Sequence, residues 1–246
     1  MKLRAHEVAK PWGRDGIGEI WFEAADGRVL PLLVKYIFTS EKLSVQVHPD
    51  DAQARARGLP NGKTECWYVL DAEPGATLAL GFRAPLDAEA LRRSALDGSI
   101  EGLLDWKPVR GGDFFFVPAG TVHAIGAGIS LIEVQQPSDT PYRLFDYGRP
   151  RELHLEDAVA VARREPYPAR HFTRVEAAES RTLVHGPPFR LDHAVGDGRV
   201  ALLEDRDRFA LPLAGTAGEA GPGDCLFLPA GEPLVARGRL LLATAG

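Results

Sequence analysis

The chain has little cysteine, little excess of either charge and no long apolar run. Cys66 and Cys225 are the only cysteines among 246 residues, and two cannot build a disulfide framework, so we expect a reducing compartment. No stretch of about 18 apolar residues could span a membrane, and the first ten residues, MKLRAHEVAK, lack a signal-peptide core. Lys and Arg number 29 against 34 Asp and Glu, which leaves no basic excess to attract nucleic acid or anionic lipid. These absences predict a soluble, cytoplasmic protein that binds neither nucleic acid nor membrane.

Short runs rich in β-branched and aromatic residues, separated by Gly and Pro, dominate the chain. With 45% hydrophobic and 26% charged residues, the composition is that of a globular protein. The runs predict a mainly β barrel or sandwich because turn residues, and not long helices, separate most of them. The predicted strands are Leu30–Phe38, Lys42–His48, Thr64–Leu70, Asp113–Val117, Ser130–Gln136, Arg199–Leu203 and Cys225–Leu228. The predicted helices are Asp50–Arg57, Ala88–Leu96 and Leu155–Arg164, with a further short one at Ile100–Asp105.

A weak internal repeat divides the chain into two β units. Gly112–Gly120 and Gly223–Gly231 both read G-D-x-x-F-x-P-A-G. Thr-Val-His123 follows the first copy, whereas Glu-Pro-Leu234 follows the second, which therefore lacks the histidine. We expect a first domain over residues 1–166, with a short helical insertion at about 85–106, and a smaller β domain over 167–246 without a site of its own.

Strand alternation gathers four side chains that can bind a metal. Successive side chains of a strand point to opposite faces, so Gln46 and His48 share one face and Glu65 faces inward on the next strand. His123 follows the Pro-Ala-Gly corner, and a barrel could bring it to the same mouth. Two imidazoles and a carboxylate suit catalytic zinc and also non-haem iron(II). As bare chemistry this spacing is a weak signal, because most His and Glu side chains only form hydrogen bonds or face solvent.

Four ordered motifs make the pattern specific. They are Leu43–Asp51 (LSVQVHPDD), Gly62–Leu70 (GKTECWYVL), Gly112–Gly126 (GDFFFVPAGTVHAIG) and Glu133–Arg149 (EVQQPSDTPYRLFDYGR). In this order they strongly resemble type I phosphomannose isomerases (mannose-6-phosphate isomerases) of the short bacterial kind, which are zinc-dependent cupins. The opening Lys10-Pro-Trp-Gly13 is also similar to that family, and the match extends over roughly residues 10–165.

The resemblance implies a fold, a reaction and a set of residues. It implies a cupin-type double-stranded β-helix (jelly-roll) barrel followed by a degenerate cupin repeat, with one zinc ion per chain. The family's metal ligands fall on Gln46, His48, Glu65 and His123. Its catalytic positions fall on Arg143, Glu133 and Lys63, and Ser44, Lys63 and Arg143 would bind the sugar phosphate. The implied reaction moves a proton between C1 and C2 of mannose 6-phosphate and fructose 6-phosphate through an enediol or enediolate.

Other readings stay open at this point. Glu133 can carry the proton if burial raises its pKa, but Lys63 or a water on the metal could be the base. Arg143 could instead form an ion pair with Asp139 or Asp146. The chain is shorter than is usual for the family, so a non-catalytic sugar-phosphate-binding cupin and an iron(II) cupin dioxygenase remain alternatives. The partner expected is a small sugar phosphate, with the protein a monomer or homodimer.

Overall fold

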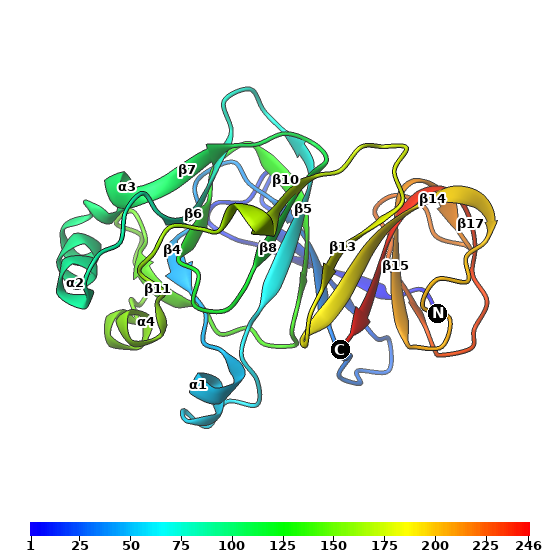
Figure 1. The fold of residues 1–246 in the computed structure, drawn as a ribbon, viewed down its shortest axis with the longest axis horizontal. Helices are drawn as coiled ribbons and strands as arrows, with labels where there is room; N and C mark the ends of the chain where they lie inside the picture. Colours follow the sequence, from blue (N-terminus) through cyan, green and yellow to red (C-terminus); the bar gives the residue numbers. More distant parts are fainter.

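The computed structural model describes all 246 residues and confirms a mainly β fold. Strands take up 44% of the chain and helices 12%. Three antiparallel sheets account for the strands, and two of them face each other as a barrel while the third lies beside it (Figure 1).

The barrel is formed by a seven-stranded and a five-stranded sheet. The seven-stranded sheet has the order β1 (Arg4–Val8), β2 (Glu19–Glu23), β3 (Leu33–Phe38), β10 (Ile129–Gln135), β5 (Glu65–Ala72), β8 (Asp113–Val117) and β12 (Phe172–Arg174). The five-stranded sheet has the order β11 (Tyr142–Phe145), β4 (Val45–Val47), β9 (His123–Ile125), β6 (Thr77–Phe82) and β7 (Leu104–Pro108). Trp67 and Leu131 from the first sheet pack against Leu78 and Ile125 from the second, which closes part of the barrel with an apolar core.

Short helices cover the outside of the five-stranded sheet. They are α2 (Ala88–Asp97), α3 (Ile100–Leu103) and α4 (Leu155–Val161). Helix α1 (Asp51–Arg55) instead projects from one end of the barrel (Figure 1), and the 3-10 turn η1 (Ala169–His171) lies against β8 (Asp113–Val117). Asp87 begins α2 by accepting a hydrogen bond from the backbone N–H of Ala90, and Gly98 ends it in the left-handed region. Val45 and Val47 of β4 face these helices. None of the helices combines the length and hydropathy that a membrane crossing requires.

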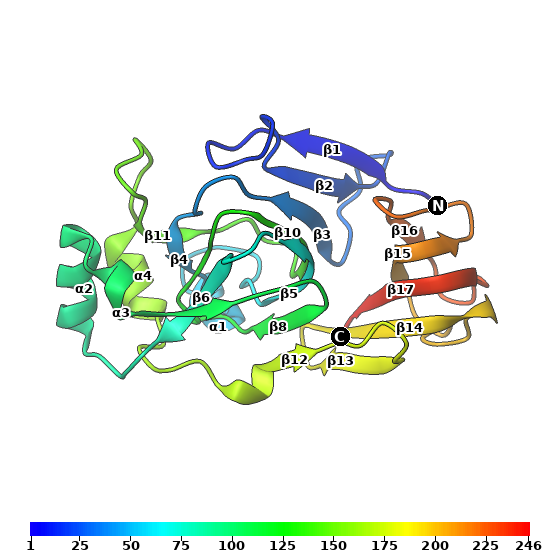
Figure 2. The same cartoon turned by 90° about the horizontal axis from the view of Figure 1, so that it is seen from above.

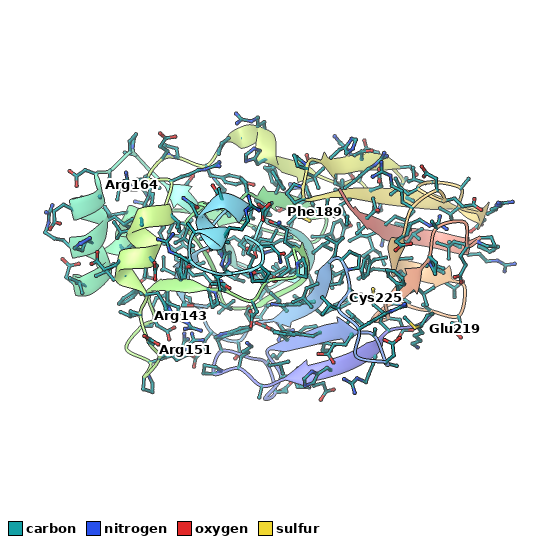
Figure 3. All side chains as sticks on the ribbon, turned by 90° about the horizontal axis from the view of Figure 1, so that it is seen from below. Arg143, Arg151, Arg164, Phe189, Glu219 and Cys225 are labelled. Carbon is teal, nitrogen blue, oxygen red and sulfur yellow. The ribbon has the colours of Figure 1, made fainter.

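The third sheet packs on the outer face of the seven-stranded sheet. This C-terminal sheet has the order β13 (Arg181–His185), β14 (Phe189–Arg199), β17 (Val235–Ala245), β15 (Arg208–Ala217) and β16 (Leu226–Leu228). Its Phe189 and Leu241 join Tyr36, Cys66 and other outward-facing barrel residues in one core of 21 buried side chains. Phe189 and Cys225 accordingly lie between the two units (Figure 3).

The first three residues cross between the two units. The backbone N–H of Leu3 donates to the carbonyl of Cys225 at 2.9 Å, and Lys2 forms a bridge with Leu226. The chain then enters β1 at the edge of the seven-stranded sheet (Figure 2). The N-terminal segment therefore extends the C-terminal sheet before it joins the barrel.

The two copies of the internal repeat have the same local structure. Asp113 and Asp224 each accept a hydrogen bond from the backbone N–H three residues earlier, at 3.0 Å in both copies. The glycines at both ends of each copy have positive φ, including 84° at Gly120 and 82° at Gly231. Each copy thus forms the same turn, strand and corner.

The strand predicted at Arg199–Leu203 is wrong. Strand β14 ends at Arg199, and a turn follows in which Leu203 has a φ of 58°. The buried guanidinium of Arg208 donates to the carbonyls of Val200 and Leu202 at 3.2 and 2.9 Å, and it also donates to Glu232. Because these carbonyls bond to a side chain, they are not available to a sheet.

Candidate active site

Three predicted metal ligands meet inside the barrel. Ligand atoms of His48, Glu65 and His123 all lie within 4.8 Å of one another, and all three side chains are buried. The Nε2 atom of His48 is 3.6 Å from Oε2 of Glu65, and the Nε2 atom of His123 is 3.4 Å from Oε1. They come from three elements that are far apart in sequence: the end of β4, the start of β5 and the start of β9.

Backbone carbonyls fix the orientation of both imidazoles. The Nδ1 of His48 lies 3.0 Å from the carbonyl oxygen of Thr140, and the Nδ1 of His123 lies 2.9 Å from that of Thr121. A carbonyl can only accept, so each Nδ1 carries the hydrogen and each Nε2 presents a lone pair to the cluster. The Nε2 of His48 and the Oε1 of Glu65 are buried without a hydrogen-bond partner. Orphaned acceptors of this kind fit a cation, and the two nitrogens and carboxylate are a donor set that zinc accepts.

The surroundings keep both imidazoles neutral. Burial lowers the pKa of His123 to about 4, and burial together with the charge of Lys63 takes the pKa of His48 well below its usual value. Burial and the charge of Glu133 raise the pKa of Glu65, while Lys63 opposes that shift. The cluster therefore presents neutral imidazole nitrogens, the form that binds metals.

Gln46 reaches the same cluster from the middle of β4. It pairs in register with His123, and its amide nitrogen lies 3.3 Å from Nε2 of that histidine. Rotating the amide by 180° would place its oxygen there instead, which is the group a metal could use. The Ser44 hydroxyl donates to the Gln46 side-chain oxygen at 3.5 Å, so Ser44 lies one step farther from the histidines.

A row of side chains crosses the inner face of the seven-stranded sheet beside the cluster. Trp21, Lys35, Glu133 and Trp67 occupy register-paired positions on β2, β3, β10 and β5. The Trp67 indole N–H donates to Oε2 of Glu133 at 3.0 Å, and Lys63 Nζ lies 3.6 Å from Oε1 of Glu133. Lys63 also pairs with Oε2 of Glu65 at 2.9 Å. Glu133 is thus linked to the metal cluster through Lys63.

Lysines on both sides of Glu133 keep it ionised, which corrects the expectation that burial raises its pKa. Burial alone would raise that pKa, but the charges of Lys63 and Lys35 and the Trp67 hydrogen bond lower it below the usual value. The same coupling acts on Lys63. Burial would lower its pKa, but Glu133 and Glu65 outweigh this effect and raise it. At neutral pH the pair is a carboxylate beside an ammonium.

Lys35 is a central member of the site that sequence reasoning missed. It is 2% exposed, and its Nζ lies 3.6 Å from Glu133, 3.7 Å from Asp139 and 3.9 Å from Glu19. The same ammonium lies 4.4 Å from the ring centroid of Trp21. One signal was present, because Lys35 is the single charged residue in the otherwise apolar run Leu30–Phe38.

A small cleft of about 80 Å³ connects this row to solvent. Its lining includes the predicted Ser44, Gln46, Lys63, Glu133 and Arg143. The Arg143 guanidinium has no carboxylate within 4 Å; it is 3.5 Å from the carbonyl of Glu152, so it pairs with neither Asp139 nor Asp146.

Arg151, which also lines the cleft, differs from Arg143 in being paired. Its guanidinium binds Asp146 through two hydrogen bonds of 2.6 Å. Both arginines come from the same end of the barrel (Figure 3).

The fold and this cluster together define a cupin with a candidate metal site in contact with two residues of a charged cleft, Gln46 and Lys63. Proteins with similar sequences indicate which cupins the chain resembles. A mannose-6-phosphate isomerase of Streptococcus mutans is 46% identical over 146 residues, which cover 57% of this chain and 46% of the relative. The mannose-6-phosphate isomerase ManA of Bacillus subtilis is 41% identical over 176 residues, covering 66% of this chain and 56% of the relative. The resemblance to mannose-6-phosphate isomerases is confirmed.

Solved structures extend the likeness to the whole chain. The crystal structure of mannose 6-phosphate isomerase from Bacillus subtilis superposes with a TM-score of 0.79 at 25% identity and covers 98% of both chains. A mannose 6-phosphate isomerase bound with zinc and yttrium has the same fold, with a TM-score of 0.73 at 17% identity. No protein-family model matches the chain. The chain spans about half the length of the curated relatives it matches.

Proposed function

We propose that this protein interconverts mannose 6-phosphate and fructose 6-phosphate and holds one zinc ion per chain. The observation that carries the proposal is the convergence of His48, Glu65 and His123. This cluster is in direct contact with Gln46 and Lys63, which line a cleft together with Glu133 and Arg143. Proteins named mannose-6-phosphate isomerase that are 46% and 41% identical over 146 and 176 residues support this reading. His48, Glu65 and His123 would hold the metal, with Gln46 as a fourth ligand through its amide oxygen.

Zinc bound in this position would supply a Lewis acid that favours negative charge on the substrate oxygens. Glu133 is the proposed proton carrier between C1 and C2, because the lowered pKa leaves it an ionised carboxylate that can accept a proton, although burial does not raise that pKa. Its Oε2 is held by Trp67, while Oε1 faces the ammonium groups of Lys35 and Lys63. A carboxylate fixed in this way can take a proton from one carbon and return it to the neighbouring carbon.

Lys63 is the proposed proton donor to the substrate oxygen, because two carboxylates within 4 Å keep it an ammonium. Arg143 has no carboxylate partner, so its forked donors are available to the phosphate or to a developing oxyanion. Ser44 adds a hydroxyl at the same wall of the cleft. We propose that Ser44, Lys63 and Arg143 together bind the sugar phosphate.

A coupled isomerase assay on metal-analysed protein tests the function. We expect about one zinc per chain, reversible loss of turnover on chelation, and recovery when zinc is added. Replacing His123 by Ala removes a ligand, so we expect metal affinity and turnover to fall by at least about 100-fold. The matched control is His185→Ala, an exposed histidine on β13, which should leave both unchanged.

Three results would contradict the proposal in different ways. Zinc with sugar-phosphate binding but no turnover would indicate a non-catalytic binder. Iron together with consumption of oxygen would indicate a cupin dioxygenase. Turnover that survives both chelation and His123→Ala would mean that the reaction does not require a metal.

A further inference from the structure

A second cleft lies between the outer face of the barrel and the C-terminal sheet. It has a volume of about 350 Å³. Its walls come from Tyr68 and Leu70 of β5, the turn at Gly111 and Gly112, the segment 175–177, and Leu213 and Arg239 of the C-terminal sheet. Figure 1 shows the C-terminal sheet beside β5. Because side chains alternate along β5, Tyr68 faces this cleft while Glu65 and Trp67 face the barrel interior.

One buried ring, that of Tyr68, lines this cleft, and the ring of His193 stacks on it. Tyr68 is only 4% exposed and lines the cleft, and its hydroxyl, which bonds to no other group of the protein, remains accessible. Its ring stacks on that of His193, with centroids 6.2 Å apart and an interplanar angle of 11°. The Nδ1 of His193 bonds to the carbonyl of Glu179 at 2.5 Å, but its Nε2 is buried without a partner. Because His193 lies behind Tyr68 and does not line the cleft, the Tyr68 hydroxyl is the ring group that a ligand in the cleft could reach.

The cleft also holds an unpaired guanidinium. Arg239 is partly buried and has no carboxylate within 4 Å, and the one carboxylate in the lining, Glu176, is exposed. Its charge reaches both rings. Burial raises the pKa of Tyr68 and lowers that of His193, and Arg239 lowers both pKa values. Both rings are therefore neutral at pH 7, and of the two charged side chains that line the cleft only Arg239 is partly buried.

We propose that this cleft binds a small organic oxyanion, a phosphate ester or a carboxylate, through the guanidinium of Arg239 and the hydroxyl of Tyr68. Arg supplies the forked donors that both oxyanions accept, and a phenol donates a further hydrogen bond. Leu70, Leu213 and Val175 offer apolar contacts to the carbon part of the ligand. The site is separate from the catalytic cleft because the two lie on opposite faces of β5.

Site-resolved NMR titration of the zinc-loaded protein tests this proposal. The probes are inorganic phosphate in one arm and acetate in the other, which distinguishes the two sources of oxyanion. We expect the backbone amide signals of Gly111, Gly112 and Leu213 to shift and saturate with at least one probe. Arg239→Ala should weaken that response by at least about tenfold, and Tyr68→Phe by a few-fold.

Two control variants separate this site from its surroundings. Arg237→Ala removes an exposed arginine from the same strand and should leave the titration unchanged. Arg143→Ala should abolish shifts in the catalytic cleft and leave those at Gly111 and Gly112 intact. The proposal is overturned if neither probe shifts the cleft signals, or if both Arg239→Ala and Tyr68→Phe, with well-dispersed spectra, titrate like the wild type.

Discussion

The buried ammonium of Lys35 stabilises three carboxylates at once. Its ammonium lies within 4 Å of Glu19, Glu133 and Asp139, so Lys35→Met would remove the cation that these carboxylates share and leave the buried Glu133 with Lys63 alone. We expect the free energy of unfolding to fall by about 3–5 kcal/mol, measured by urea denaturation of the metal-free protein. Lys107→Met is the control, since its pair with Asp105 is about one-third exposed and should matter by less than about 1 kcal/mol. A loss for Lys35→Met no larger than the control's would refute this account.

His193 makes stability depend on pH. Its pKa is lowered in the folded protein, chiefly by burial, from an unfolded value of about 6.5. The unfolded chain therefore binds a proton more readily, and the stabilisation present above pH 6.5 is lost as the pH falls toward the folded pKa. We expect His193→Phe to reduce the loss of unfolding free energy between pH 7.5 and 5, as measured by urea midpoints. His185→Phe, at an exposed position, should keep the wild-type slope; equal slopes for His193→Phe and the wild type would contradict this assignment.

Among single residues, the meeting of the candidate ligands was predictable and the charges around them were not. Strand alternation predicted which faces Gln46, His48 and Glu65 occupy, and all three lie beside His123 in the structure, because the parity of side chains is a local property. Lys35 depends on which strand lies next to which. Its partner Glu133 is almost 100 residues away in sequence, and only the register of β3 on β10 brings them together.

At the scale of elements, Gly81 allows β6 to lie directly against the segment that follows α4. Its φ is 66°, and a Cβ there would lie 2.7 Å from the backbone nitrogen of Tyr167. Gly81→Ala therefore combines left-handed strain with a backbone clash, and we expect a loss of roughly 3 kcal/mol in unfolding free energy. Gly16→Ala has a similar φ of 85° but open space around it, so about 1 kcal/mol is expected. Equal losses for the two variants would mean that the close approach does not matter.

The positions of Gly and Pro in the sequence predicted short strands better than long ones. The predicted Asp113–Val117 matches β8, whereas β15 was missed because Pro212 stands within it. The structure accommodates that proline at a register shift between Pro212 and Ala214 on the partner β17. Because the register shifts here, the N–H that Pro212 lacks is not needed for a hydrogen bond between the strands. No residue pattern near Pro212 predicts this shift.

At the scale of the whole molecule, the shared core predicts that the barrel and the C-terminal sheet unfold together. Phe189 is 1% exposed and packs on barrel residues, with its ring centroid 6.2 Å from that of Phe116. We expect Phe189→Ala to cost about 3–5 kcal/mol, and Val29→Ala, at an 87% exposed side chain, within about 0.5 kcal/mol.

Tryptophan fluorescence provides the decisive measurement for that variant. All four tryptophans lie in the first 106 residues, so their emission reports on the barrel, while circular dichroism reports on both units. We expect the two signals to give one coincident transition, moved to lower urea in Phe189→Ala. A shift seen by dichroism and not by fluorescence would mean that the C-terminal sheet unfolds alone, as two domains divided near residue 166 could do.

The pairing of the first residues with β16 sets an order on folding during synthesis. The amide of Leu3 and the carbonyl of Cys225 lie at opposite ends of the chain, and at about 5–20 residues per second the ribosome needs on the order of 10–45 s to make the second after the first. This hydrogen bond is therefore among the last that a nascent chain can form. Until β16 has been synthesised, residues 1–3 have no strand to pair with. The exposed, polar side chains of Arg4, His6 and Glu7 on the neighbouring β1 disfavour pairing of this sheet edge with another copy of the chain during that time.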